Sequence, residues 1–235
     1  MNSTRFKSIV ILTGAGISAE SGIRTFRDAN GLWQNYRIEE VASPEAFARN
    51  PELVHDFYNQ RRRQLQEPTI QPNGAHHALA RLESEWEGDF LLVTQNVDDL
   101  HERAGSKKLL HMHGSLIRAL CLSCDERFEW RKDMSTNEVC PKCRTTGKLR
   151  PDIVWFGEMP YHMEVILEAL NSCDLFISIG TSGVVYPAAG FAREAWKARR
   201  IEINIQDTDV SPLFHERRVG PASVEVPKFV EELLN

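Results

Sequence analysis

The sequence predicts an α/β protein whose larger part is a doubly wound parallel sheet, accompanied by a smaller second module. Short apolar runs at 9–12, 89–94 and 174–179 alternate with segments of helical pattern, as they do in βαβ units. A G-x-G-x-x-A pattern that starts at Gly14 follows the first run, as in nucleotide-binding βα turns. Two C-x-x-C pairs fall within 121–143, which predicts a compact metal-bearing insert rather than another βαβ unit.

Composition and charge limit the partners that this chain can have. Its 235 residues allow one medium domain, or one large and one small domain, and the 42 % hydrophobic content is ample for a packed core. The formal net charge of −5 gives no general attraction to nucleic acid or to an anionic membrane. Neither a membrane-length apolar run nor a signal-peptide pattern is present. We therefore expect a soluble cytoplasmic protein with no nucleic-acid or membrane partner.

The glycine-rich turn near the N-terminus predicts a site for a nucleotide phosphate. The β-branched run 9–12 is typical of a buried parallel strand, and it ends at Gly14 and Gly16. Ala19 takes the place of the third glycine. In a strand–turn–helix unit such small residues allow backbone N–H groups to approach a pyrophosphate at the start of the helix. An ordinary tight βα turn is the alternative.

The stretch after this turn argues against an ordinary nucleotide-dependent dehydrogenase. Such enzymes have a second strand that ends in Asp or Glu about 20 residues further on, where the acid binds the ribose. Residues 27–36 are polar instead, without a strand pattern or an acid at the expected place. We expect a loop that folds over the ligand.

Residues 37–72 are expected to form a polar helical insert. Ser43-Pro44 is a helix start, with serine as the N-cap and proline at the first position. A second helix covers about 51–66, and on it Tyr58 and Arg61 are three residues apart and share one face. For these two residues alone, a solvated polar face is the usual interpretation.

Polar side chains gather where two further strands are expected to end. Gln95, Asn96 and Asp98 follow the strand over 89–94, and a third strand, ending in a glycine turn, carries His113. Ligands of open α/β sheets bind just beyond the carboxyl ends of the strands. These side chains are therefore candidates for a ligand site.

Four of the five cysteines form two C-x-x-C pairs that are separated by fifteen residues. This is zinc-ribbon spacing, in which each pair forms a turn and the two turns close a tetrahedral thiolate cage. Because all ligands are cysteines, no position is left for a catalytic water, so we expect one structural Zn ion per chain. The expected ligands are Cys121, Cys124, Cys140 and Cys143, whereas Cys173 stands alone and is expected in the core. Buried or redox-active thiols are the alternative.

The rest of the chain continues the alternation of helix and strand. The expected elements are a helix over 73–85, an extended edge over 153–156, a helix over 163–171, a glycine-hydroxyl turn at 180–183, a crossover helix over about 187–199, a strand over 200–205, a short strand over 223–226 and a terminal helix over 227–234. The larger domain is expected to comprise 1–36, 73–115 and 150–235. The smaller domain, a helical insert plus the zinc ribbon, is expected to comprise 37–72 and 116–149.

Together these segments resemble the sirtuins, which are NAD-dependent protein lysine deacylases, and the match covers nearly the whole chain. The matching segments are Gly14–Ser18, Gly22–Arg27, Thr94–Asp98, His113-Gly114, the four cysteines, Val154–Glu158, Gly180–Ser182 and Asn204. The chain departs from many members at Thr25, where they carry aspartate. This departure and the Tyr58-x-x-Arg61 pair are similar to the branch that contains bacterial deacylases and the mitochondrial desuccinylase.

The resemblance implies a Rossmann-like large domain and a zinc-bearing small domain, with NAD and acyl-lysine entering between them. It places in the NAD site Gly14, Ala15, Gly16, Phe26, Arg27, Gln95, Asn96, Asp98, Gly180, Thr181, Ser182, Asn204 and Ala222. It places in the substrate site Tyr58, Arg61, Val154, Phe156, Gly157, Glu158, Val184 and Tyr186. Acylated lysines of many proteins would bind there as an added extended strand, through backbone bonds that tolerate many sequences.

By the same resemblance, His113 and Asn96 are the catalytic residues. Because the acyl oxygen is a poor nucleophile, the leaving nicotinamide must be well positioned and water kept out. A neutral His113 can then accept a ribose hydroxyl proton near pH 7. His111 is the competing candidate, and His101 is expected on a helix surface. The products of the family are nicotinamide, free lysine and O-acyl-ADP-ribose.

The acyl group is expected to be acetyl or succinyl, and malonyl by extension. Under the resemblance, Arg61 would present a planar set of N–H donors to the terminal carboxylate of succinyl- or malonyl-lysine, and Tyr58 would add a hydroxyl donor. Acetyl-lysine lacks that carboxylate, but it should still be accepted if water solvates the guanidinium. We therefore expect one enzyme with both deacetylase and desuccinylase activity.

Three other functions share some of these features. Mono-ADP-ribosyl transfer would use the same cofactor and the same activated carbon with a different acceptor. A non-catalytic NAD-binding module is disfavoured by the intact His113 and Asn96. A zinc-ribbon nucleic-acid protein is disfavoured by the net charge of −5 and by the few aromatic residues near the cysteines.

Overall fold

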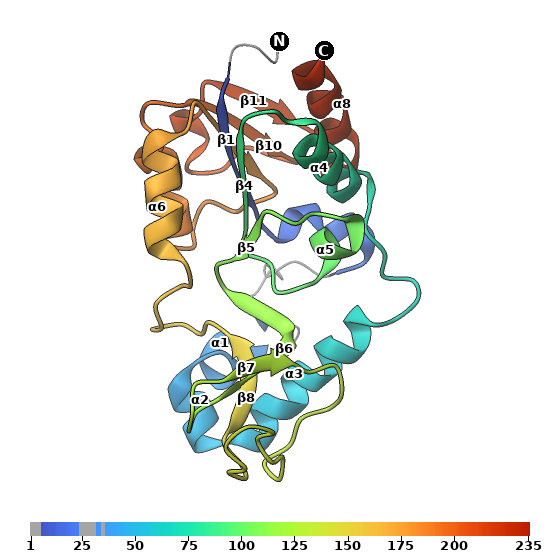
Figure 1. Ribbon diagram of the computed structural model, residues 1–235, viewed down its shortest axis with the longest axis vertical. Coiled ribbons are helices and arrows are strands. Elements are labelled where there is room, and N and C mark those ends of the chain that lie inside the picture. The colour runs from blue at the N-terminus through green and yellow to red at the C-terminus, as the bar shows by residue number, and fades with distance from the viewer. Residues whose placement is uncertain (1–5, 24–31, 34–35) are drawn as a thin grey trace.

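The larger part of the molecule is a six-stranded sheet in the order β11-β10-β9-β1-β4-β5, in which all neighbouring strands are parallel (Figure 1). The computed structural model describes residues 6–23, 32–33 and 36–235. The strands of this sheet are β1 (Ser8–Thr13), β4 (Asp89–Thr94), β5 (Leu109–His111), β9 (Leu175–Ile179), β10 (Arg199–Asn204) and β11 (Glu216–Val219). The predicted doubly wound parallel sheet is confirmed.

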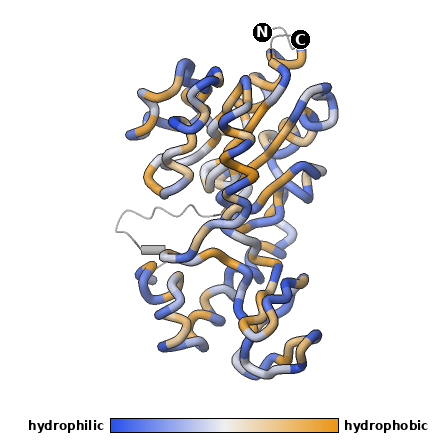
Figure 2. The backbone as a smooth tube through the Cα atoms, turned by 60° about the vertical axis from the view of Figure 1, so that its left-hand side comes forward, coloured by the Kyte–Doolittle hydropathy of each residue, from blue (hydrophilic) through white to orange (hydrophobic). Residues whose placement is uncertain are grey.

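Helices cover both faces of this sheet. α4 (Gly74–Glu85) and α8 (Ala222–Leu234) lie side by side on one face, and α6 (Met163–Ser172) and the short α7 (Phe191–Glu194) lie on the other (Figure 1). Side chains of a strand alternate between the two faces. Ile9 and Ile11 of β1 therefore pack under α4 and α8, whereas Val10 and Leu12 pack under α6 and α7. A strand covered on both sides must be apolar throughout, and Figure 2 shows such hydrophobic segments running through the interior.

A second, antiparallel sheet and three helices form the smaller module at the other end of the molecule (Figure 1). The sheet order is β7-β6-β8, with β6 (Gly114–Cys121), β7 (Arg127–Glu129) and β8 (Leu149–Ile153); the helices are α1 (Ile38–Val41), α2 (Pro44–Arg49) and α3 (Pro51–Leu65), preceded by the hairpin of β2 (Leu32–Trp33) and β3 (Tyr36–Arg37). The expected cap of α2 is present, because Ser43 Oγ accepts a hydrogen bond from the Ala46 N–H at 3.1 Å.

The chain passes from the larger sheet to the smaller one directly after His113. Gly114 opens β6 with a φ of +83°, and a Cβ at this position would overlap the carbonyl oxygen of Asp152 on β8. Only glycine combines this left-handed backbone with so close an approach. The expected domain boundary at 149/150 falls inside β8, which pairs with β6 along 149–153. The strand lies at 149–153 in the smaller sheet, and of the extended edge expected over 153–156 only Ile153 belongs to it.

The C-terminal segment differs from the prediction. The last strand is 216–219 rather than 223–226, and α8 runs through Pro227 instead of beginning there. The valines around 224–226 suggested a strand, but Ala222, Val226 and Val230 are buried on one helical face against the large sheet. Burial of that face outweighs the one hydrogen bond that proline removes from the helix.

The helices elsewhere are short. The crossover helix expected over 187–199 is one turn of 3₁₀-helix, Ala188–Gly190, followed by α7. Further 3₁₀ turns are Ala15–Ile17, Ala19–Ser21 and Ser211–Leu213, and α5 (Leu100–Ala104) is little more than one turn. No helix in the described part of the chain is long and apolar enough to cross a membrane.

Candidate active site

Two glycine turns meet at the centre of the large sheet. The chain runs from β1 to β4 and β5 on one side and later to β9, β10 and β11 on the other, so the strand order reverses between β1 and β9. The Gly14 N–H donates to the Ile179 carbonyl at 3.0 Å, and the Gly16 N–H donates to the Gly180 carbonyl at 2.9 Å. A Cβ on Gly16 would lie 2.7 Å from the Gly180 Cα. Open α/β folds bind nucleotides at such a reversal, beyond the carboxyl ends of the strands.

The turn after β1 continues as the two 3₁₀ turns rather than as the long helix that the glycine pattern suggested. On the other side of the reversal, Asn204 Nδ2 donates to the Thr181 carbonyl at 2.7 Å and so joins the end of β10 to the turn after β9. Ala222 is buried at the start of α8. The side chain of Glu20 accepts hydrogen bonds from the Ser223 N–H at 3.0 Å and from its hydroxyl at 2.7 Å. These contacts bring most of the predicted NAD-site positions to one edge of the sheet.

A polar loop, residues 95–99, follows β4. Asn96 and Asp98 are less than a tenth exposed. Asn96 Nδ2 donates to Ser18 Oγ at 3.1 Å, and Ser18 Oγ donates to Asp98 Oδ2 at 3.0 Å. Ser18 belongs to a segment that matches the sirtuins but has no expected role of its own; its place in the glycine turn is the sequence signal that points to this site. The loop and the glycine turn thus form one hydrogen-bonded unit.

Burial raises the pKa of Asp98 to about 6, despite hydrogen bonds from the Leu100 N–H and from Ser18 that oppose this shift. A carboxyl that accepts protons so readily is poised to accept a hydrogen bond from a hydroxyl or an amide of a ligand. Gly14, Gly16 and Gly180 would approach a pyrophosphate, and Asp98 and Asn96 offer polar groups beside it, so the residues present fit NAD.

His113 lies between the two sheets, and hydrogen bonds fix both its backbone and its ring. Its carbonyl accepts a hydrogen bond from the Val154 N–H at 2.9 Å. Its Nδ1 lies 3.1 Å from the Gln95 carbonyl oxygen, which can only accept, so Nδ1 carries the proton and Nε2 has a free lone pair. Burial lowers the pKa of His113, partly offset by this bond. The ring is therefore neutral near pH 7, as a general base must be.

The expectation that His101 lies on a helix surface is wrong. The residue is 1 % exposed, its Nε2 lies 3.0 Å from Thr13 Oγ1, and its ring contacts that of His76 with centroids 4.9 Å apart. The expectation failed because α5 packs against α4, so that His101 contacts His76 of α4 and Thr13 of β1 instead of solvent. Burial lowers the pKa of both histidines, that of His76 to about 4, so both are neutral.

Tyr58 and Arg61 lie on one face of α3, as predicted, and both are buried rather than solvated. The Trp155 Nε1–H donates to Tyr58 Oη at 2.9 Å. Arg61 Nη1 donates to the Phe57 carbonyl at 2.5 Å, and its guanidinium lies over the Phe57 ring. Burial lowers the pKa of Arg61 to about 10, which still leaves it charged near pH 7.

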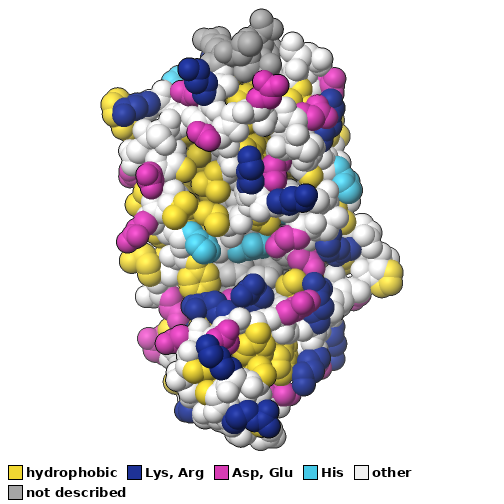
Figure 3. Space-filling view, in the orientation of Figure 1, with side chains coloured by type: hydrophobic (Ala, Val, Ile, Leu, Met, Phe, Trp, Pro, Cys, Tyr) yellow, Lys and Arg dark blue, Asp and Glu magenta, His cyan; other side chains and the backbone are white. Residues whose placement is uncertain are grey.

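The segment 154–158 and the segment around 184–186 present exposed apolar side chains. Phe156 is 47 % exposed, Val184 51 % and Tyr186 69 %. The Glu158 carboxylate accepts hydrogen bonds from the Arg150 guanidinium at 2.7 Å and from the Trp155 N–H at 2.8 Å. On the face seen in Figure 3, histidine side chains lie at mid-height, between apolar side chains above and a group of Lys and Arg side chains below.

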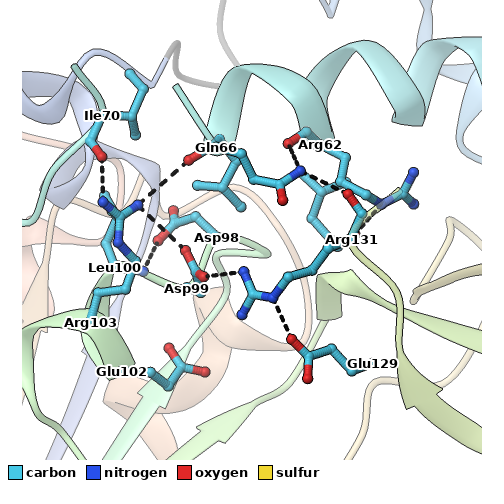
Figure 4. Close-up of polar contacts among 12 residues, drawn as sticks. Arg62, Gln66, Ile70, Asp98, Asp99, Leu100, Glu102, Arg103, Glu129 and Arg131 are labelled. Atoms are coloured by element: carbon cyan, nitrogen blue, oxygen red, sulfur yellow. Dashed lines mark hydrogen bonds and ion pairs between the residues drawn. The ribbon is translucent and has the colours of Figure 1, made fainter. Parts of the chain in front are cut away.

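Ion pairs and backbone bonds connect the polar loop to the smaller module. Asp99 lies between Arg103 of α5, at 3.7 Å, and Arg131, which follows β7, at 3.4 Å (Figure 4). Arg131 also pairs with Glu129, and its carbonyl accepts from the Gln66 side chain at 2.9 Å. The sequence offered no signal for this junction, because its members lie far apart along the chain.

The four cysteines converge as predicted. Their sulfur atoms all lie within 4.8 Å of one another, with Cys121 and Cys143 at 3.7 Å and Cys124 and Cys140 at 3.8 Å. A tetrahedral ion with Zn–S bonds of about 2.3 Å requires sulfur atoms about 3.8 Å apart. The cage therefore fits one zinc ion. Cys173 is buried in the core, as expected. Phe26 and Arg27, which were expected in the NAD site, lie outside the described residues.

The fold and the site together define a Rossmann-type nucleotide-binding enzyme that carries a cysteine-ligated metal module. A model of the Sir2 family matches residues 14–187. The chain belongs to the Sir2 family, which confirms the resemblance to the sirtuins.

Individual relatives support the same conclusion. A Bdellovibrio bacteriovorus protein named NAD-dependent protein deacylase is 67 % identical over 234 residues, which cover 100 % of each chain. A Vibrio vulnificus protein of the same name is 57 % identical over 97 % of this chain and 94 % of its own. A solved structure titled a Sir2 homolog–NAD complex is 40 % identical, with a TM-score of 0.88 over 99 % of this chain and 93 % of that chain.

Proposed function

We propose that this chain is an NAD-dependent protein lysine deacylase that removes both acetyl and succinyl groups, and malonyl groups by the same recognition. The deacylase activity follows from the family and from relatives that bear this name. The choice of acyl group rests on one observation, the placement of Tyr58 and Arg61. A short series of contacts connects this pair to the candidate base. The His113 carbonyl accepts a hydrogen bond from the Val154 N–H, and the side chain of the next residue, Trp155, donates one to Tyr58. Arg61 lies one helical turn after Tyr58 on α3.

The site residues of this chain have separable proposed tasks. The pyrophosphate would lie against Gly14, Ala15 and Gly16. The adenosine side would be bound by Gly180, Thr181, Ser182, Asn204 and Ala222. The nicotinamide end and its ribose would be bound by Gln95, Asn96 and Asp98. When NAD is bound, His113 Nε2 would accept the proton of a ribose hydroxyl and so act as the general base. NAD supplies the activated ribose carbon when bound. Phe26 and Arg27 are proposed to cover that ligand.

The acyl-lysine is proposed to bind as an extended strand between the segments 154–158 and 184–186. Both segments have exposed side chains, and a strand added between them would use backbone hydrogen bonds that accept many sequences. Val154, Phe156, Gly157 and Val184 would lie along the peptide, with Glu158 and Tyr186 at the ends of the two segments.

Cysteines that act as metal ligands must stay reduced, which favours a cytoplasmic location.

A carboxylate near Arg61 would offset the cost of burying the guanidinium. That cost is visible in the lowered pKa of Arg61. A charge-assisted hydrogen bond contributes about 1.5–3 kcal/mol. This corresponds to roughly a 10- to 150-fold preference in binding. An acetyl group makes no such bond, and water can solvate the guanidinium in its place.

The test is Arg61→Met, assayed with matched succinyl-lysine and acetyl-lysine peptides. We expect KM for the succinyl peptide to rise roughly 10- to 150-fold, while acetyl turnover stays within about threefold. Arg63→Met is the matched control, because Arg63 lies on the same helix with its side chain 59 % exposed. Equal losses on both substrates would show that Arg61 supports the fold or the cofactor instead.

A further inference from the structure

Two histidines, two residues apart, bind neighbouring carbonyls of the polar loop but differ in their second ring nitrogen. His113 Nδ1 bonds the Gln95 carbonyl, and His111 Nδ1 bonds the Asn96 carbonyl, each at 3.1 Å. His111 Nε2 in addition lies 2.7 Å from Glu102 Oε1 of α5. His111 is thus held at both nitrogens by groups from different elements.

Both partners of His111 are acceptors. A backbone carbonyl has no proton to give, and a glutamate gives none near pH 7 because its proton prefers the more basic imidazole. Two acceptors at 2.7 and 3.1 Å therefore require N–H groups on both nitrogens, which is the imidazolium form. We propose that His111 is a positioning residue: as an imidazolium paired with Glu102, it holds Asn96 in the geometry that NAD requires.

The charges around His111 support the protonated state. Burial lowers its pKa, but the hydrogen bond and charge of Glu102, the Asn96 carbonyl and the nearby Asp98 outweigh burial and raise the pKa above the ordinary value. Glu102 faces it from α5 and Asp98 from the polar loop. The other titratable neighbour on α5, His101, is neutral because its own pKa is lowered well below the usual range.

The bond from His111 differs in kind from the other bonds that hold Asn96. The Asn96 N–H donates to Thr94 Oγ1 at 3.0 Å, and its side-chain amide donates to Ser18 Oγ at 3.1 Å. These partners are neutral and do not titrate in the physiological range. When His111 loses a proton, the remaining proton goes to the better acceptor, the Glu102 carboxylate. The Nδ1 lone pair then faces the Asn96 carbonyl oxygen, and the bond becomes a repulsion.

The direction of the pH effect follows. The imidazolium is present below the raised pKa of His111, and it is lost as pH rises through that pKa. The affinity for NAD should therefore fall on the alkaline side, while the KM for the peptide changes little. This inference rests on the proposed role of Asn96 at the nicotinamide end of NAD.

The experiment measures the dissociation constant and KM for NAD from about pH 6 to about pH 9.5 in the zinc-loaded enzyme. His111→Leu should raise both constants roughly tenfold at neutral pH, because the Asn96 carbonyl loses a charged donor. His111→Gln keeps a neutral amide donor, so it should recover most of the affinity and abolish the alkaline rise. His77→Leu, on an exposed histidine of α4, is the matched control and should behave as the parent does.

Ring nitrogen resonances of His111 give a readout that does not depend on activity. They should show both nitrogens protonated near pH 7, and Glu102→Gln should shift the deprotonation to lower pH. Glu87→Gln, on an exposed acid, should leave the resonances unchanged. A neutral ring near pH 7 in the parent protein would overturn the proposal.

The kinetic outcomes separate this inference from the role of Asn96. If Asn96→Ala weakens NAD binding and His111→Leu lowers only thermal stability, the positioning role of His111 is wrong and the role of Asn96 stands. If Asn96→Ala leaves NAD binding unchanged, the proposed role of Asn96 fails, and the inference drawn from it fails too.

Discussion

Three histidines of this site show how the surroundings of one side chain decide its chemistry. His113 is neutral, with its proton on Nδ1 and a lone pair on Nε2, which suits a base. His111 lies between a carbonyl and a carboxylate, which suits a fixed cation. His101 is buried against Thr13 and His76 and stays neutral. The sequence could place His113 beside a glycine turn, but it could not distinguish these states, because the deciding partners come from other segments.

The assignment of His113 as the base predicts a loss of turnover without a loss of cofactor. His113→Ala should lower kcat roughly 100- to 10,000-fold, because a general base contributes about that much. Calorimetry should find NAD still bound. Because burial lowers the pKa of His113, the acid-side fall of kcat/KM in the parent should begin only below the ordinary histidine range. Near-normal deacylation by the variant would reject the assignment.

Most secondary-structure elements could be predicted because they follow local rules. Ser43 caps α2, Pro51 begins α3, and the apolar run 89–94 is a strand with the predicted bounds. The errors occurred where burial overrides local preference. Pro227 lies inside α8 because the helix is held by its buried face, and β8 extends a sheet whose partner strand lies about thirty residues earlier. Pairing between distant strands leaves no local pattern.

Because the zinc ion is expected to be structural, its loss should lower thermal stability. The chemistry should be unchanged in any molecule that stays folded. Cys140 is fully buried in the cage, so Cys140→Ser should remove the zinc and lower Tm markedly, because metal binding contributes to folding directly. Elemental analysis should find about one zinc per chain in the parent and less in the variant.

Cys173→Ser is the control for this variant. Cys173 is equally buried but lies in the large sheet's core, away from the cage, so its replacement should leave the zinc content unchanged. A Cys140→Ser protein with normal zinc content and unchanged Tm would contradict the structural role of the metal.

At the scale of the molecule, the polar loop after β4 joins the two parts. The Val97 carbonyl accepts from the Leu116 N–H of β6 at 2.8 Å, and the Leu116 carbonyl accepts from the buried Arg62 of α3 at 2.9 Å. Asp99 adds its pairs with Arg103 and Arg131 (Figure 4). Both parts of the molecule are thus bonded to one loop, which also carries the proposed nicotinamide-binding residues.

A double-mutant cycle tests this junction. Asp99→Asn should lower the free energy of unfolding by about 1–2 kcal/mol, because it leaves Arg103 and Arg131 without their shared carboxylate. Arg131→Gln should lower the free energy of unfolding by a smaller amount, about 0.5–1 kcal/mol, because the Arg131 side chain is 47 % exposed. The double variant should be less destabilised than the sum of the two.

The exposed pair of Arg63 and Asp133 is the control for the cycle. The side chains of that pair are 59 % and 56 % exposed, so Arg63→Gln should change stability by less than about 0.5 kcal/mol. Urea unfolding of the zinc-loaded proteins measures all four values. Strict additivity of Asp99→Asn and Arg131→Gln would show that the two side chains do not act together.

The central claim, NAD-dependent acyl transfer by this site, is tested most directly by the mass of the products. A succinyl-lysine peptide incubated with the enzyme and NAD should yield one nicotinamide and one O-succinyl-ADP-ribose for each lysine freed, and His113→Ala should yield almost none. Without NAD no lysine should be freed. Lysine freed in the absence of NAD, or ADP-ribose attached to the peptide or the enzyme in place of O-succinyl-ADP-ribose, would contradict the account.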